Sequence, residues 1–280
     1  MSRVPYSGRR AGLATRHSKE EALAPPFREV LEFEVFAVDV DTDSFGTFTG
    51  DIPRIDTPLN TAIAKARAGM LASGHSIGVA SEGTIGPDPF MPFVTSDIET
   101  IAFVDDERGI VISETTRSVD IVAIRQTVTS DDDLTPVLER ADFPRHGLIV
   151  RPPQAREGPI VKGITNQDAL VAAIRECSAN FGSAVVESDL RACYSPSRMI
   201  NIRQCAEVLA KRIATPCPAC ASPGWGRTEP ARGLPCSACG TFVDSAIRAD
   251  VFGCPFCPEV REVPRPAEFV EPRWCPSCNP

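Results

Sequence analysis

The chain has 280 residues, with 37 acidic side chains against 29 lysines and arginines and a formal net charge of −8. This charge excludes a general nucleic-acid binder, whose surface is basic, and no apolar run of about 18 residues could form a transmembrane helix. No apolar segment of the secretory type follows the basic start, so we expect no membrane partner and a cytoplasmic, reducing location.

Strand and helix patterns alternate over residues 1–214. The apolar stretches that predict strands lie, in chain order, at residues 8–15, 33–40, 76–83, 97–106, 108–116, 120–128, 147–152 and 184–189. Helix patterns begin near residue 18 and recur at residues 56–74, 165–182 and 195–214. This alternation predicts an α/β fold, a mixed twisted sheet flanked by helices, in which the three strands between residues 97 and 128 continue one sheet.

Start and stop signals support the predicted helices. The helix at 56–74 has Pro58 in its first turn and Gly74 at its end, the positions that favour these residues. For the helix at 165–182 we expect Thr165 and Asp168 to form a variant capping box, with Gly182 just beyond the last turn.

Eight of the eleven cysteines form four C-x-x-C pairs in the last quarter of the chain. A C-x-x-C turn directs two thiolates at one metal ion, and two such turns complete a tetrahedral site. The spacing between the first and second pairs, and between the third and fourth, is that of a zinc ribbon. A reducing compartment disfavours disulfides. The predicted metal ligands are Cys217, Cys220, Cys236, Cys239, Cys254, Cys257, Cys275 and Cys278.

We therefore predict two structural zinc ions in a region of tandem ribbons at 215–280, separate from an α/β domain at 1–214. Pairing of neighbouring C-x-x-C turns is favoured, because each half alone has ribbon spacing; interleaved pairing, first with third and second with fourth, is the alternative. Four thiolates leave no open position on the metal, so these ions would be structural and not catalytic.

Polar residues follow several of the predicted strands. In α/β sheets, ligands bind where the carboxyl ends of strands meet helix N-termini. The first strand is followed by Thr15, Arg16, His17, Ser18 and Lys19, the third by Ser81 and Glu82, and the last by Glu187, Asp189 and Arg191. Such a mixture of cations and carboxylates suits a phosphorylated ligand bound with magnesium. Solvated loop ends are the alternative.

Two segments resemble a known family. "ATRHSKEEAL", followed by "AIAKARAGM" and "SIGVASEG", is similar to the non-canonical purine nucleoside triphosphate pyrophosphatases, the inosine/xanthosine triphosphatase and Maf-like superfamily. Thr15 and Lys19 match its phosphate loop, Lys65 its helix motif, and Glu82 its acidic strand end. The family's Asn in the first loop is replaced by Arg16 and His17. At full length the chain resembles bacterial proteins of unassigned function that carry C-terminal cysteine pairs.

The resemblance implies a magnesium-dependent hydrolase of a nucleotide or related phosphate ester. In that hypothesis Lys19 and the amides around Ser18 hold phosphate, and Glu82, with Asp97 or Glu99, holds magnesium and orients water. The ligand-binding set is Thr15, Arg16, His17, Ser18 and Lys19, with Arg191 and Arg198 at the other end of the ligand. The alternative is a non-enzymatic nucleotide sensor whose zinc ribbons bind a protein or RNA.

Overall fold

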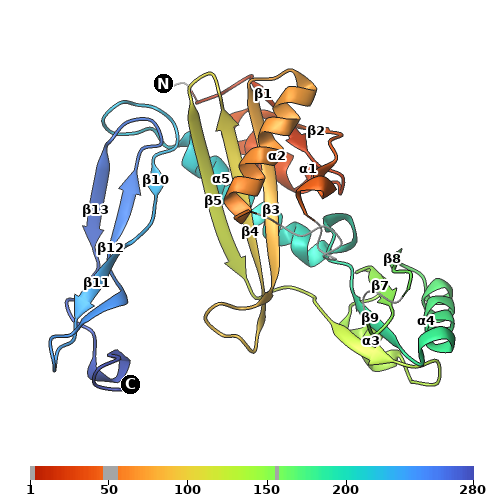
Figure 1. Ribbon diagram of the computed structural model, residues 1–280. Coiled ribbons are helices and arrows are strands. Elements are labelled where there is room, and N and C mark those ends of the chain that lie inside the picture. Colours follow the sequence, from red (N-terminus) through yellow and green to blue (C-terminus); the bar gives the residue numbers. More distant parts are fainter. Residues whose placement is uncertain (1–3, 47–55, 155–157) are drawn as a thin grey trace. The chain divides into compact units, whose positions relative to one another are not determined.

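The computed structural model describes residues 4–46, 56–154 and 158–280, and it confirms a mixed α/β fold with helices flanking the sheets (Figure 1). The chain forms two compact units. One comprises Tyr6–Leu209, and the other is built mainly from Ala210–Pro280. None of the described helices is long and apolar enough to cross a membrane.

A five-stranded sheet forms the centre of the first unit. Its order is β2-β1-β3-β4-β5, with the first three strands parallel and the others antiparallel. β3 and β4 are long, and β3 continues well past the point where β1 ends (Figure 1). The strands are β1 (Arg10–Ala14), β2 (Glu34–Val38), β3 (Ile77–Pro87), β4 (Thr95–Asp105) and β5 (Ile110–Ser118).

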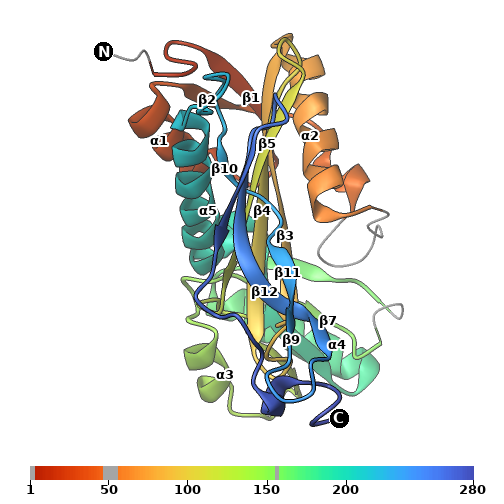
Figure 2. The same cartoon turned by 90° about the vertical axis from the view of Figure 1, so that its left-hand side faces the viewer.

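Helices cover both faces of this sheet. Figure 2 shows α1 (Glu20–Leu31) and α5 (Pro196–Ala214) on one side and α2 (Pro58–Ser73) on the other. A short 3-10 turn, η1 (Thr42–Phe45), follows β2. The predicted signals of α2 are confirmed, since Pro58 is in its first turn and Gly74 ends it with a left-handed φ of 70°.

Different side chains fill the core on the two faces. Beneath α1, the rings of Phe27, Phe33 and Phe103 lie 5.8–6.4 Å apart, within the range of favourable aromatic contacts. On the α2 face the side chains are smaller, with Ala66 and Met70 of the helix packed on Ala80 and Val104 of the sheet. The small residues let α2 approach the strands closely.

A second, four-stranded antiparallel sheet has the order β6-β9-β7-β8. Its core includes Leu148, Leu170 and Val186. Its elements are β6 (Arg125–Val128), α3 (Thr135–Arg140), β7 (Leu148–Arg151), β8 (Val161–Ile164), α4 (Gln167–Phe181) and β9 (Ala184–Ser188), followed by the 3-10 turn η2 (Ala192–Tyr194).

The expectation that residues 120–128 continue the first sheet is wrong. Only Arg125–Val128 form a strand, and it pairs with β9 of the second sheet. Part of the preceding backbone bonds to side chains: Val122 N–H donates to Ser197 Oγ at 3.1 Å, and Ile124 N–H to Ser188 Oγ at 3.0 Å. The Ile124 carbonyl accepts a single backbone bond from Ser188 N–H at 3.0 Å. These bonds satisfy the polar backbone of a linker without a ladder.

One helix cap also differs from the prediction. Asn166 caps α4 through its Oδ1, which accepts a hydrogen bond from Ala169 N–H at 2.8 Å, so the cap lies one residue after Thr165. The predicted end is confirmed, because Gly182 follows α4 with a left-handed φ of 79°.

The second unit is a small antiparallel sheet with little apolar core. Its strands are β10 (Gly226–Arg227), β11 (Ala231–Pro235), β12 (Phe242–Gly253) and β13 (Val260–Pro264), and η3 (Pro272–Trp274) follows. β12 is central, with β10 and β11 on one side and β13 on the other. Its buried cluster includes two cysteines, Cys236 and Cys275, beside Val243. Apolar packing alone therefore contributes little to the stability of this sheet.

A pair of glycines in β3 tests the packing between the sheet and α5. A Cβ added at Gly83 would overlap the side chains of Glu99 and Arg198, whereas one at Gly86 would meet open space. We expect Gly83→Ala to destabilise the protein by about 1–3 kcal/mol, the usual cost of overpacking, and the control Gly86→Ala by no more than about 0.5 kcal/mol. Urea unfolding measures both; equal effects would contradict this packing.

Candidate functional site

The eight predicted ligand cysteines gather in two groups of four. Each group brings four Sγ atoms within 4.8 Å of one another, so each can hold a metal ion. The first group is Cys217, Cys220, Cys254 and Cys257, and the second is Cys236, Cys239, Cys275 and Cys278.

The sulfur separations fit tetrahedral zinc. The Sγ atoms of Cys217 and Cys257 lie 3.7 Å apart, as do those of Cys239 and Cys275. A zinc ion with four Zn–S bonds of about 2.3 Å places neighbouring sulfurs about 3.8 Å apart. A disulfide would need about 2.05 Å. The distances therefore favour two four-thiolate zinc sites.

The favoured pairing of neighbouring C-x-x-C turns is wrong, and the interleaved arrangement is the one observed. The reason is the length of β12, which joins the second turn to the third. Its twelve residues extend roughly 35–40 Å, so they carry the chain from one end of the ribbon to the other. There Gly253, at the end of β12, pairs with Gly226, close to the first turn. At the opposite end Cys236 bridges to Val270, close to the fourth turn.

Paired cysteine substitutions test this arrangement. Cys217→Ser and Cys254→Ser should each release the same one of two zinc ions, because both residues serve one site, and the double variant should release no more. Combining Cys217→Ser with Cys236→Ser should release both ions. Elemental analysis of zinc per chain measures this. Loss of both ions from the double variant Cys217→Ser/Cys254→Ser, in which Cys236 is unchanged, would contradict the interleaved sites.

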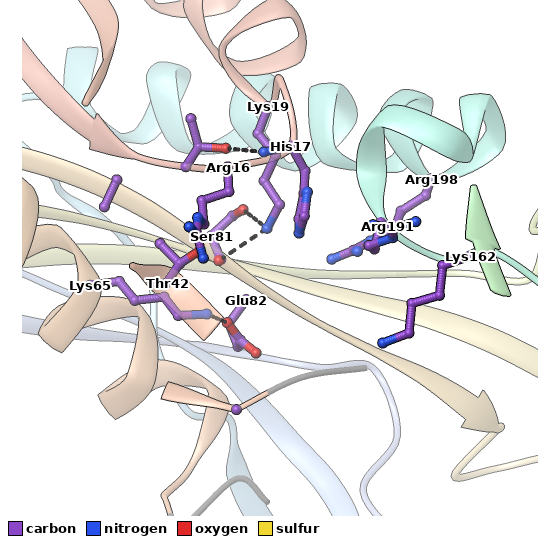
Figure 3. Close-up of a pocket in the computed structure, with 13 residues that line it drawn as sticks. Arg16, His17, Lys19, Thr42, Lys65, Ser81, Glu82, Lys162, Arg191 and Arg198 are labelled. Carbon is purple, nitrogen blue, oxygen red and sulfur yellow. Dashed lines mark hydrogen bonds and ion pairs between the residues drawn. The ribbon is translucent and has the colours of Figure 1, made fainter. Parts of the chain in front are cut away.

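A cavity of about 120 Å³ opens beside the carboxyl end of β1 in the first unit. Cations dominate its lining, with six lysine and arginine side chains and one carboxylate among the described residues. Figure 3 shows them arriving from distant parts of the chain. The lining residues are Ala14, Thr15, Arg16, His17, Lys19, Thr42, Gly46, Lys65, Ser81, Glu82, Lys162, Arg191 and Arg198.

The loop after β1 forms one wall of the cavity. Thr15 Oγ1 accepts a hydrogen bond from His17 N–H at 3.3 Å, which holds the start of the loop in a turn. Ser18 has a left-handed φ of 53°, and the chain reverses there before α1. Arg16 is exposed and forms an ion pair with Asp41 at 2.8 Å. Of the predicted ligand-binding residues in this loop, Thr15, Arg16, His17 and Lys19 line the cavity, and Ser18 is not among its described lining residues.

Lys19 lies against β3. Its Nζ donates to Ser81 Oγ at 2.9 Å and to the Ser81 carbonyl at 3.4 Å (Figure 3). Burial, and after it the nearby charge of Arg198, lowers the pKa of Lys19 to about 8.

Glu82 and Lys65 form a buried ion pair from β3 and α2. Lys65 Nζ lies 2.6 Å from Glu82 Oε2, and both side chains are less than a tenth exposed. Lys65 belongs to the apolar stripe of α2, beside Ala62 and Ala66. A lysine on such a stripe needs a partner, and the sequence comparison, which matched Lys65 to a helix motif, did not predict its pairing with Glu82.

The expected grouping of Glu82 with Asp97 or Glu99 around one ion is wrong. Glu82 pairs with Thr100 in the β3–β4 register, and Gly83 pairs with Glu99. Because paired residues share a face and successive residues alternate, Glu82 faces α2 while Asp97 and Glu99 face α5. The sheet separates the carboxylates.

Asp97 and Glu99 belong to a buried network with α5. Arg198 Nε lies 2.6 Å from Glu99 Oε1, and Asn201 Nδ2 donates to Asp97 Oδ2 at 3.0 Å. Burial, and after it the charge of Glu99, raises the pKa of Asp97 to about 7. Asp97 does not line the cavity, whereas Arg198 does. The network thus holds Arg198 in place.

Arg191 and Lys162 reach the cavity from the second sheet. Arg191 Nη2 lies 2.6 Å from Asp189 Oδ2, and its guanidinium stacks 4.6 Å from the centroid of the Tyr194 ring. Asp189 also accepts a hydrogen bond from Gly163 N–H at 2.9 Å. One carboxylate therefore ties the loop of Arg191 to the strand end that carries Lys162.

These side chains do not build a magnesium site of their own. Magnesium prefers several oxygen ligands in octahedral geometry. Among the described residues that line the cavity, Glu82 is the one carboxylate, and its Oε2 is bonded to Lys65. The cavity is instead suited to an anion.

Comparison with known families gives one match. A family model described as a domain of unknown function (DUF6671) matches residues 65–280, more than three quarters of the chain. The chain belongs to this family. No curated protein and no solved structure matches the chain. The resemblance to nucleoside triphosphate pyrophosphatases therefore rests on sequence motifs alone.

The DUF6671 match includes all eight ligand cysteines and six of the thirteen described residues that line the cavity. Lys65, Ser81, Glu82, Arg191 and all eight ligand cysteines fall inside it, whereas the loop after β1, with Lys19, precedes it. One family model thus spans the cysteine clusters and part of the cavity, and it assigns no activity to either.

A pH-dependent stability measurement tests the buried carboxyl network. The pKa of Asp97 rises from 3.8 to about 7 on folding, so the folded state binds the proton more tightly and wild-type stability falls as pH rises through this range. Asparagine imitates the neutral acid. We therefore expect Asp97→Asn to raise the thermal midpoint more at pH 8 than at pH 5. The exposed control Asp131→Asn should change little at either pH, and a pH-independent effect of Asp97→Asn would contradict the network.

Proposed function

We propose that this DUF6671 protein binds a nucleotide or a related phosphate ester in the cavity beside β1 and hydrolyses it. One observation carries the proposal: six cationic side chains converge on a small cavity in a chain whose net charge is −8. Cations are costly to bring together without an anion, and phosphate is the anion that lysine and arginine commonly bind.

The arrangement of the cations suits a ligand with more than one phosphate. Lys65 lies on one side of the cavity, and Lys162, Arg191 and Arg198 gather on another (Figure 3). A diphosphate or triphosphate chain offers charge to both groups at once. This agrees with the nucleotide substrates implied by the sequence resemblance.

Glu82 is the carboxylate that the proposal assigns to water activation. It is the acidic side chain among the described cavity residues, and Lys65 holds its position. Once phosphate attracts Lys65, Glu82 can accept a hydrogen bond from water. Magnesium would enter with the nucleotide, since it is commonly bound by one or two carboxylates together with substrate phosphates.

The alternative is a nucleotide sensor without turnover. The ion pair between Lys65 and Glu82 favours it, because a carboxylate that keeps its lysine partner does not activate water. In this alternative the zinc-binding unit would contact a protein or RNA. Exposed Phe256, Phe269 and Trp274, with Arg273 stacked 5.5 Å from the Trp274 ring centroid, are side chains suited to such contacts.

A thermal-shift titration with nucleoside triphosphates, with and without magnesium, tests the binding. We expect triphosphate to raise the midpoint of the wild-type chain, and Lys19→Met to lose most of that rise because it removes one cavity charge. Lys211→Met makes the same change at an exposed lysine and is the control. No shift in the wild type with any triphosphate would contradict the proposal.

Turnover is tested by the phosphate or pyrophosphate released in the same samples. Glu82→Gln should keep ligand binding and lose turnover. Loss of one partner of the buried pair should also cost about 3–5 kcal/mol of stability, so each ligand-dependent shift is compared with the variant's own midpoint. Binding without release in the wild type would favour the sensor.

A further inference from the structure

Ser81 occupies a special position in β3. β1 pairs with β3 through Gly12–Gly78 and Leu13–Val79, and Ser81 comes two residues after the last of these pairs. Ser81 as a residue is 3% exposed, yet it lines the cavity. The hydroxyl therefore lies where a bound phosphate would be placed, shielded from bulk water.

Lys19 is held on this hydroxyl by two contacts. Its Nζ lies 2.9 Å from Ser81 Oγ and 3.4 Å from the Ser81 carbonyl oxygen (Figure 3). The carbonyl bond orients the amine, and the shorter contact joins it to the hydroxyl. A serine and a lysine at this distance form the pair that serves as nucleophile and base in serine–lysine hydrolytic sites.

The charges around Lys19 suit a base. Arg198 from α5 and Lys65 from α2 disfavour its protonation, Glu99 from β4 and Glu82 from β3 favour it, and burial is the largest influence. The resulting pKa of about 8 leaves part of the lysine neutral near neutral pH. A group that only clamps phosphate gains nothing from a neutral form, whereas a general base requires one.

We propose that Ser81 is the nucleophile of the cavity and that Lys19 is its general base. This role rests on the proposed phosphate-binding function, and it means that hydrolysis proceeds through a covalent phosphoserine. Neutral Lys19 Nζ takes the hydroxyl proton as Ser81 Oγ bonds to phosphorus. The bond from phosphorus to the leaving oxygen breaks, and that oxygen departs with the electron pair.

The second half of the reaction restores the serine. Water attacks the phosphorus of the phosphoserine, and the bond from Ser81 Oγ to phosphorus breaks. One proton of the water ends on Ser81 and the other stays on the released phosphate, while Lys19 returns its proton to solvent. The cavity cations balance the charge of both steps.

Labelling with methanesulfonyl fluoride, a small neutral reagent that sulfonylates activated serines, tests the pair without a phosphorylated ligand. We expect Ser81 to be labelled, at a rate that rises with pH through about 8. Lys19→Arg and Lys19→Met should each lower the rate by about 100-fold or more, because a positioned base contributes at least that much. The control Lys211→Arg should keep the wild-type rate.

The labelled residue is identified by peptide mass mapping. Ser81→Ala should abolish the label, and the control Ser76→Ala, which changes a hydrogen-bonded serine just before β3, should not. Thermal midpoints confirm that each variant is folded. Labelling of Ser81 that is equally fast without Lys19, or no labelling of Ser81 in the folded wild type at pH 9, would overturn the proposal.

Measurements of turnover distinguish the role of Ser81 as nucleophile from the proposed hydrolysis of a phosphate ester. Wild type mixed with nucleoside triphosphate and quenched in acid should carry a phosphoryl or nucleotidyl group on Ser81, and Ser81→Ala should bind triphosphate but lose the adduct and turnover. Full turnover by Ser81→Ala would contradict the role of Ser81 as nucleophile, while the proposed hydrolase activity would still hold. Sulfonylation of Ser81 with no triphosphate binding would support the reactive serine–lysine pair and contradict the proposal that the cavity binds a nucleotide.

Discussion

The unequal lengths of β1 and β3 are the constraint on which the cavity depends. β1 has five residues and β3 has eleven, and the two pair near the end of β1. Past that point β4 supports β3 on one side, and its other side borders the cavity. Successive residues there point to opposite faces, so Ser81 meets Lys19 and Glu82 meets Lys65. The open edge lets helices on both faces contribute to one site.

The cavity brings positive side chains close together, and contacts with neighbouring carboxylates keep several of them in place. The buried pair of Arg198 and Glu99, and the bonds of Arg191 to Asp189, fix cations that would otherwise repel one another. The hydrogen bonds of Lys19 to the described residues go to Ser81, and burial, followed by the charge of Arg198, lowers its pKa. Position in the network therefore separates permanent charges from one that titrates near physiological pH.

Local patterns in the sequence predicted much of this structure, because helix signals and apolar runs act over short distances. The ends of α2 and the loop after β1 are examples. The face of the sheet on which a carboxylate lies depends on the pairing register of β3 and β4. The sequence around Glu82 and Asp97 does not show that register. The linker before β6 has an apolar pattern, but two of its backbone N–H groups donate to the side chains of Ser188 and Ser197. Such contacts between distant segments are not readable from spacing.

The interleaved cysteine clusters change what the covalent chain must do in the second unit. β12 runs between the second and third C-x-x-C turns, so the chain before it contributes one turn of two cysteines to each cluster. The chain after it again contributes one such turn to each. With zinc in both clusters, a backbone cut within β12 would leave two fragments still joined at two separate points. The metal ions would then carry the connectivity that the peptide bond had lost.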